Sequence, residues 1–205
     1  YFLENHDEQR IASDFFAGDG KKGIPAMVAS VLMQRNPFML YAGQEYGERG
    51  MDAEGFSGRD GRTTIFDYWS IDTLCRSAWD TLNDDEREIA ATYQKVLRIA
   101  NKEKSVSEGV FFDLMYANCH LDRQYVFLRK ADNEILIVAV NFDDRDVSIG
   151  VNLPAHAFEF LEINEAKFVT TDLLSGKKKT FELLKDTCIA LQITGNGALV
   201  LKMKQ

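Results

Sequence analysis

Apolar residues in the first fifth of the chain fall into three short runs. Residues 1–3 and 38–42 are short and continuously apolar, which predicts strands buried in a parallel sheet. Residues 26–33 between them are almost all apolar or small, and Pro25 stands where a helix can begin without losing a hydrogen bond. Strand, helix and strand in this order predict a βαβ unit with a right-handed crossover.

A longer helix is predicted after residue 82. Asn83 and Glu86 have the spacing of a capping box, in which each side chain bonds the backbone N–H of the other residue. Ile89, Tyr93 and Val96 then recur at the spacing of one helix face. This face is therefore expected to be buried.

The hydrophobic period changes after a short polar stretch at residues 105–109. Beyond this stretch, short strand-like runs alternate with turns, including a hairpin turn at residues 131–134, which predicts an all-β sandwich. Two domains are therefore expected, residues 1–104 and residues 105–205. The predicted strands of the second domain are 110–116, 125–130, 135–142, 147–153, 158–161, 167–172, 179–184, 188–193 and 198–204.

Composition and charge describe an ordinary globular protein. Apolar residues make up 45% and charged residues 27% of the chain, a mixture typical of soluble domains. The net charge of −8 provides no basic surface for nucleic acid or an anionic membrane, and no apolar run approaches the about 20 residues of a membrane span. Cys75, Cys119 and Cys188 lack CxxC spacing, so free, buried thiols are expected and no disulfide framework or metal site.

The chain begins inside a predicted strand and without an initiating methionine. It is therefore expected to be a fragment of a longer protein, and a signal peptide would lie outside it. The compartment stays open, although a soluble protein of the cytoplasm or periplasm is expected.

Polar groups cluster directly after the first apolar run, as Glu4, Asn5, His6 and Asp7. An α/β barrel presents this pattern at the carboxyl ends of its strands, where its catalytic residues lie. The pattern is equally typical of a strand that ends in a solvated turn, because Asn and Asp are ordinary turn residues. The first ten residues alone leave both interpretations open.

Three motifs in this order resemble the α-amylase family of glycoside hydrolases. Residues 2–7, FLENHD, are similar to the seventh-strand motif of that family, F-x-x-N-H-D. Residues 37–45, PFMLYAGQE, are similar to its eighth strand with the G-x-E ending, and residues 61–69, GRTTIFDYW, to the loop that often follows. Residues 172–176, DLLSG, also resemble the C-terminal sandwich that follows the barrel in this family.

The resemblance implies the last quarter of a (β/α)8 TIM barrel followed by a C-terminal β-sandwich. It also implies a fragment of a retaining α-glucan hydrolase of the α-amylase or α-glucosidase type. Such enzymes need a carboxylate nucleophile and a carboxylic acid about 5–5.5 Å apart. By the resemblance both groups lie on upstream strands, so the isolated fragment is expected to be inactive.

The same resemblance makes Asp7 the catalytic residue of this chain. Asp7 would accept hydrogen bonds from sugar hydroxyls, and these bonds strengthen as positive charge develops in the transition state. His6 and Asn5 are assigned to substrate binding, with His6 donating to a neighbouring hydroxyl. The supporting residues, which would fix these groups or face the same pocket, are Glu4, Arg10 and Glu45.

A glycine-rich connection at residues 43–70 would leave the carboxyl end of the second predicted strand, on the active-site face of a barrel. Loops of this length are usually functional. Glu45 near its start has either a pocket-facing or a structural role. The aromatic side chains of the connection could stack on sugar rings or pin the loop to the barrel, and pinning is favoured for most of them. They are Tyr46, Phe56, Phe66, Tyr68 and Trp69.

Two rival functions remain. A non-enzymatic barrel relative could serve as a carbohydrate-binding or partner subunit, although it would not need Asn5, His6 and Asp7 together. A transglycosidase or isomerase of the same family would keep these residues and differ in its loops and water access. The expected partners are an α-glucan or maltooligosaccharide and a second copy paired through open strand edges, with no nucleic acid and no membrane. No cofactor is visible, and by the resemblance any calcium ligands lie upstream.

Overall fold

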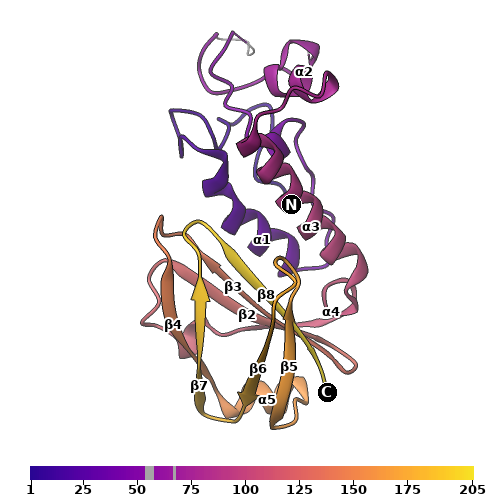
Figure 1. Cartoon of the computed structure of the whole chain (residues 1–205), viewed down its shortest axis with the longest axis vertical. Coiled ribbons are helices and arrows are strands. Elements are labelled where there is room, and N and C mark those ends of the chain that lie inside the picture. The colour runs from indigo at the N-terminus through magenta and orange to yellow at the C-terminus, as the bar shows by residue number, and fades with distance from the viewer. Residues whose placement is uncertain (54–57, 67) are drawn as a thin grey trace. The chain divides into compact units, whose positions relative to one another are not determined.

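The computed structural model describes residues 1–53, 58–66 and 68–205 (Figure 1). They divide into unit 1, residues 1–30 and 36–94, and unit 2, residues 31–35 and 95–205. The division passes through two helices, α1 (Ile24–Leu32) and α3 (Asp84–Lys102). The predicted domain boundary between residues 104 and 105 stays a prediction.

Unit 1 consists of helices and long loops. Met27 and Val28 of α1 are completely buried, which agrees with the apolar sequence of this helix. An isolated parallel bridge between Phe2 and Met39 joins the two runs that flank this helix, and the predicted strand–helix–strand unit is otherwise not formed as regular strands in the described residues. The other helical segments are η1 (Gly20–Gly23), η2 (Gln44–Tyr46), η3 (Tyr68–Ser70) and α2 (Asp72–Ala78).

The predicted burial of these two runs is wrong for this chain. Tyr1, Phe2 and Met39 are 66%, 51% and 47% exposed. A parallel pair is buried only when helices or further strands cover both of its faces. In the described part of unit 1 the pairing is limited to one bridge, so neither run becomes a regular strand.

The start of α3 has the reciprocal cap that its sequence predicts. The backbone N–H of Glu86 donates to Asn83 Oδ1, and the N–H of Asn83 donates to Glu86 Oε2, both at 2.9 Å. Two of the four N–H groups that a helix start leaves unpaired are often satisfied in this way. Ile89, Tyr93 and Val96 are buried along one face, as expected.

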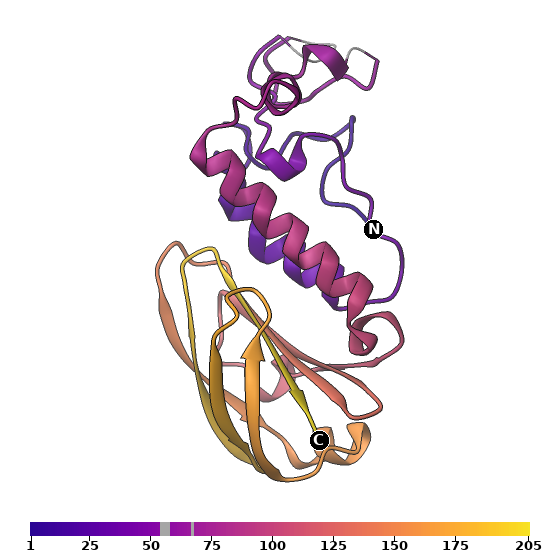
Figure 2. The ribbon, with the colours of Figure 1, turned by 45° about the vertical axis from the view of Figure 1, so that its right-hand side comes forward.

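Unit 2 is a β-sandwich, as predicted (Figures 1 and 2). A six-stranded sheet has the order β1-β2-β3-β8-β5-β6, and the second sheet pairs β4 with β7. All of the paired strands are antiparallel. The strands are β1 (Val110–Asp113), β2 (Gln124–Ala131), β3 (Glu134–Asn141), β4 (Val147–Leu153), β5 (Ala166–Asp172), β6 (Lys178–Leu183), β7 (Thr187–Ile193) and β8 (Ala198–Lys204).

The core of unit 2 lies between the two sheets. Leu128 and Ile137 from the larger sheet belong to the same buried cluster as Val151 and Leu191 from β4 and β7. Along β7 buried and exposed residues alternate, because successive side chains of a strand point to opposite faces. The two-residue hairpin between β2 and β3 forms as predicted, and Asp132 takes the left-handed backbone conformation that its turn requires.

Residues 158–161 were predicted as a strand, and this prediction is wrong. They belong to α5 (Ala155–Leu161), which Figure 1 shows at one end of the sandwich. Ala157, Phe158 and Leu161 are buried at helical spacing, and Pro154 precedes the helix in an extended conformation. A short apolar run does not distinguish a strand from a buried helix turn, which explains the error.

The three cysteines are free, as predicted, but their predicted burial is wrong. Cys119 and Cys188 are exposed and Cys75 is half-buried. Cys188 occupies an outward position of β7, where the alternation of the strand places it.

A buried arginine connects β2 to α4 (Lys104–Ser107). Arg129 is 2% exposed and donates to the carbonyl oxygens of Ser105 at 2.9 Å, Val106 at 2.6 Å and Met33 at 2.9 Å. Burial and the nearby Arg35 lower the pKa of Arg129 to about 10, so the guanidinium stays charged at neutral pH. The three carbonyl groups replace the water that the charge loses on burial.

No helix in the described ranges has the length and apolar character needed to cross a membrane.

Candidate functional site

The loop that follows the first apolar run is shaped by Asn5. Its Oδ1 accepts hydrogen bonds from the backbone N–H groups of Asp7 at 2.8 Å and Glu8 at 2.9 Å, which is an Asx turn. The side chains of His6 and Asp7 are 44% and 76% exposed, and His6 Nε2 lies 3.5 Å from Asp7 Oδ1. The turn therefore presents an imidazole and a carboxylate side by side, where both can reach a ligand.

A buried ion pair fixes the two ends of this loop. Glu4 and Arg10 are 2% and 0% exposed, and Arg10 Nη1 donates to Glu4 Oε2 at 2.7 Å. The other carboxylate oxygen of Glu4 accepts the N–H of Ile11 at 2.7 Å. Burial raises the pKa of Glu4, while the charge and hydrogen bond of Arg10 act in the opposite direction. The structure thus brings together Glu4 and Arg10, two of the residues predicted to support Asp7 and His6.

Arg10 also joins segments that are distant in the sequence. It donates to Thr63 Oγ1 through Nε at 3.1 Å and Nη2 at 2.6 Å, and to the carbonyl of Ala42 at 2.7 Å. Its guanidinium lies 4.1 Å from the ring centre of Tyr41, a cation–π contact. Sequence reasoning missed Thr63 and Tyr41, although both lie within motifs that carry the family resemblance.

The loop at residues 58–66 lies beside Asp7. The N–H of Arg10 donates to the carbonyl of Gly61 at 2.6 Å, and Gln9 Nε2 donates to the carbonyl of Asp60 at 3.3 Å. Asp60 pairs with Arg62 at 2.5 Å and raises its pKa, and the charge of Asp7 adds to this effect. Arg62 is therefore a cationic group near Asp7 that the sequence did not reveal.

Glu45 and Glu48 hold the start of the glycine-rich connection. Glu45 is half-buried, accepts the N–H of Gly43 at 3.0 Å, and has its pKa raised by burial. Burial alone would raise the pKa of Glu48 as well, but hydrogen bonds from Thr73 and Gly50 hold it below its ordinary value. Glu48, which sequence reasoning missed, connects this loop to α2. A role for Glu45 at the substrate stays a prediction.

The aromatic side chains of the same connection differ in their surroundings. Tyr46 is pinned as predicted, because its hydroxyl accepts a hydrogen bond from Ser77 Oγ at 2.9 Å. Phe66, Tyr68 and Trp69 are 63%, 60% and 63% exposed in this chain, so their pinning to a barrel stays a prediction. Phe56 lies outside the described residues, as does the aspartate at position 67 of the third motif.

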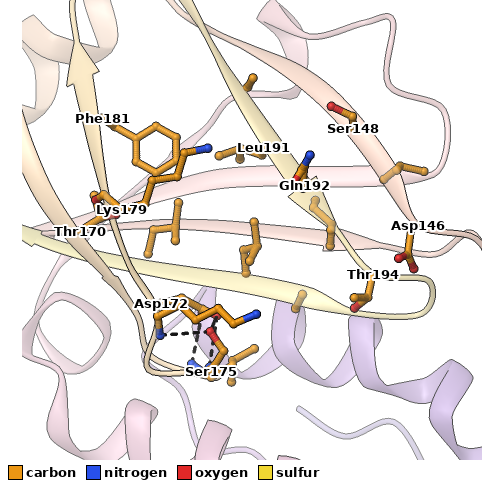
Figure 3. Close-up of a pocket in the computed structure, with 18 of the residues that line it drawn as sticks. Asp146, Ser148, Thr170, Asp172, Ser175, Lys179, Phe181, Leu191, Gln192 and Thr194 are labelled. Atoms are coloured by element: carbon orange, nitrogen blue, oxygen red, sulfur yellow. Dashed lines mark hydrogen bonds between the residues drawn. The ribbon is translucent and has the colours of Figure 1, made fainter.

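A cavity of about 890 Å³ opens in unit 2, along the strands β5 to β8 (Figure 3). Its polar lining includes Lys179, Gln192 and Thr194, together with Asp172, which accepts the backbone N–H groups of Leu174 and Ser175. Asp172 is thus occupied in shaping the turn of the DLLSG motif. None of the lining residues belongs to the loop of Asp7.

Within residues 1–53, 58–66 and 68–205, no three His, Cys, Asp or Glu side chains converge as a group that could hold a metal ion.

No protein-family model matches the sequence, and no curated protein matches it. Solved structures share its fold over the whole chain. The noncanonic maltogenic α-amylase AmyB from Thermotoga neapolitana is 17% identical, with a TM-score of 0.65 over 41% of its own length. The α-amylase from Geobacillus thermoleovorans, complexed with acarbose, is 15% identical, with a TM-score of 0.63 over 38% of its length. AmyP E221Q, in complex with maltotriose, is 20% identical, with a TM-score of 0.65 over 40% of its length.

These likenesses establish the fold of the chain. It is the fold of the C-terminal part of α-amylase-family glycoside hydrolases, including their C-terminal β domain. The family resemblance seen in the sequence motifs is therefore confirmed at the level of fold. The chain spans between 38% and 41% of the length of these three structures.

Proposed function

We propose that this chain is part of a retaining α-glucan hydrolase of the α-amylase or α-glucosidase type, which is called the parent enzyme below. The observation that carries the proposal is the loop of Asn5, His6 and Asp7, in which a buried ion pair and an Asx turn present His6 and Asp7 together. Its position beside the Phe2–Met39 parallel bridge agrees with the rim of a barrel. The acarbose and maltotriose in two of the similar structures support an α-glucan as the ligand class.

In this proposal Asp7 is the transition-state-stabilising carboxylate. It accepts hydrogen bonds from hydroxyls of the sugar ring at the cleaved bond. The ring gains positive charge in an oxocarbenium-like transition state, so bonds to a carboxylate strengthen as the reaction proceeds. The Asn5 turn and the Glu4–Arg10 pair hold the loop before the substrate arrives, which avoids a reorganisation cost during the reaction.

His6 would donate to a neighbouring hydroxyl and so orient the same sugar. Phe66, Tyr68 and Trp69 expose their rings and would stack on further sugars of a longer chain. The nucleophile and the general acid would be supplied by the part of the parent enzyme upstream of this chain. The chain alone would therefore bind sugar weakly and would not break a glycosidic bond.

The comparison of the parent enzyme with the isolated chain tests this proposal. Both are incubated with starch, with maltooligosaccharides and with an activated α-glucoside, and the products are quantified. We expect turnover by the parent and none by the 205-residue chain. Turnover that co-purifies with the chain and disappears in Asp7→Ala would show that the catalytic groups lie elsewhere. Products longer than the substrate would indicate a transglycosidase.

A further inference from the structure

Four rings form a cluster at the surface of unit 2, in which Phe112 is half-buried against the core and the other three rings are exposed. Phe112 of β1 lies with its ring centre 5.7 Å from that of Phe160 and 5.5 Å from that of His156, both on α5. Tyr116, on the short helical turn η4 (Met115–Ala117), lies 5.2 Å from His156 and hydrogen-bonds to its Nε2. Tyr116 and Phe160 are 51% and 62% exposed. We call these four residues the ring cluster.

A hollow of about 390 Å³ adjoins this cluster, and Phe160 is one of its walls. Most of its charged lining comes from α4 and from the β2–β3 hairpin. Lys104 pairs with Asp132 at 2.6 Å and with Glu108 at 3.5 Å, and Lys130 donates to the carbonyl of Asp132 at 2.7 Å. Glu162 is a third carboxylate of the lining, so two lysines face three carboxylates and the hollow has no excess of positive charge that would select an anion.

We infer that the hollow and the ring cluster form an accessory binding site for a carbohydrate chain, an α-glucan if the proposed function holds. Each sugar hydroxyl can both donate and accept hydrogen bonds, and the lining offers ammonium donors as well as carboxylate acceptors. The exposed rings offer the apolar surface that the C–H faces of a sugar ring require, while Tyr116 and His156 add polar groups at the edge. The volume is within the about 300–1,000 Å³ of small-molecule pockets.

The charges of the lining argue against anionic ligands. A phosphate, a nucleotide or an acidic peptide would need cations that are not already paired, and here Lys104 faces two carboxylates while Lys130 is bonded at Asp132. Exposed apolar patches on a folded protein commonly mark a binding surface. A neutral polyhydroxylated chain satisfies both features of the site, its already bonded lysines and its open rings.

Titration calorimetry of the full 205-residue chain with maltoheptaose tests this inference, and cellohexaose serves as the β-linked comparison. We expect binding of maltoheptaose, at least about tenfold weaker in Phe160→Ala. Phe160→Trp should retain binding because it keeps an exposed ring. Phe142→Ala, which removes another half-exposed ring of unit 2, should leave the affinity unchanged. Thermal unfolding of each variant confirms that the sandwich is intact.

Several results would overturn the inference. They are absence of binding of both maltoheptaose and cellohexaose, binding that Phe160→Ala leaves unchanged, and a concentration-dependent dimer that Phe160→Ala dissolves. The last result would assign the ring cluster to contacts between protein chains. Failure of the proposed function is separate, because it would appear as a parent enzyme without turnover while maltoheptaose binding at Phe160 persisted.

Discussion

Asp7→Asn in the parent enzyme is expected to lower kcat by about 10²–10³, while the Kd for maltotriose stays within a few-fold of its original value. The amide keeps the shape of the side chain and its contact with a hydroxyl but loses the negative charge. That charge matters most when the sugar ring becomes positive, so the loss falls on the transition state rather than on ground-state binding. Initial rates at saturating maltooligosaccharide, with the Kd from calorimetry, provide both numbers.

Glu8→Gln is the matched control for this change. Glu8 is the next residue of the same loop and is exposed. The substitution Glu8→Gln therefore removes the same negative charge one position away from Asp7. We expect its kcat to stay within a few-fold of the original value. An Asp7→Asn enzyme that behaves like Glu8→Gln would refute the catalytic assignment of Asp7.

Arg10→Met in the 205-residue chain is expected to lower the free energy of unfolding by about 3–5 kcal/mol. The change leaves the buried carboxylate of Glu4 without its cation and removes the hydrogen bonds to Thr63 and Ala42. Urea unfolding followed by tryptophan fluorescence measures this loss, because both tryptophans, Trp69 and Trp79, lie in unit 1.

The exposed pair of Arg49 and Asp14 provides the control. These side chains are 55% and 58% exposed and lie 2.5 Å apart, so Arg49→Met should cost at most about 1 kcal/mol. A similar small loss in Arg10→Met would mean that the buried pair does not hold the loop. In Arg10→Met combined with Glu4→Gln the buried charge is gone, and part of the lost stability should return.

The loss of unfolding free energy in Arg10→Met should also depend on pH, and the burial of Glu4 determines the direction of this dependence. Burial raises the pKa of Glu4 above its unfolded value, and removal of Arg10 raises the pKa further. A raised carboxyl pKa stabilises the folded state below the unfolded pKa of about 4.3, and this contribution is lost as pH rises through the folded pKa. Arg10→Met should therefore be least destabilised below about pH 4, and an equal loss at neutral pH would contradict this account.

Local sequence patterns predicted much of the fold. The Asn83–Glu86 cap, the β2–β3 hairpin and the alternating strands of unit 2 each depend on neighbouring residues, so the sequence contains the information. The α5 helix was missed because its apolar run is too short to show a period. The exposure of Phe2 and Met39 was missed because burial depends on what covers a strand, and a strand's own sequence does not contain this information.

For the candidate site too, local sequence patterns predicted one part and missed another. The motif identified the loop of Asp7, but the partners of Arg10 lie 32 and 53 residues further along the chain, at Ala42 and Thr63. Long-range hydrogen bonds of this kind leave no local pattern. Arg62 was missed for the same reason, because its approach to Asp7 depends on how the loop at residues 58–66 folds back.

The configuration of the first sugar product tests the central claim most directly. A retaining hydrolase replaces the substrate bond twice, first with a carboxylate and then with water, so an α-linked substrate yields an α-anomer. Proton NMR spectra of the parent enzyme with maltoheptaose, recorded before the product mutarotates, show which anomer appears first. We expect the α-anomer, at a rate that Asp7→Asn reduces by about 10²–10³. The β-anomer as first product, or an unchanged rate in Asp7→Asn, would contradict the claim that this chain supplies Asp7 to a retaining α-glucan hydrolase.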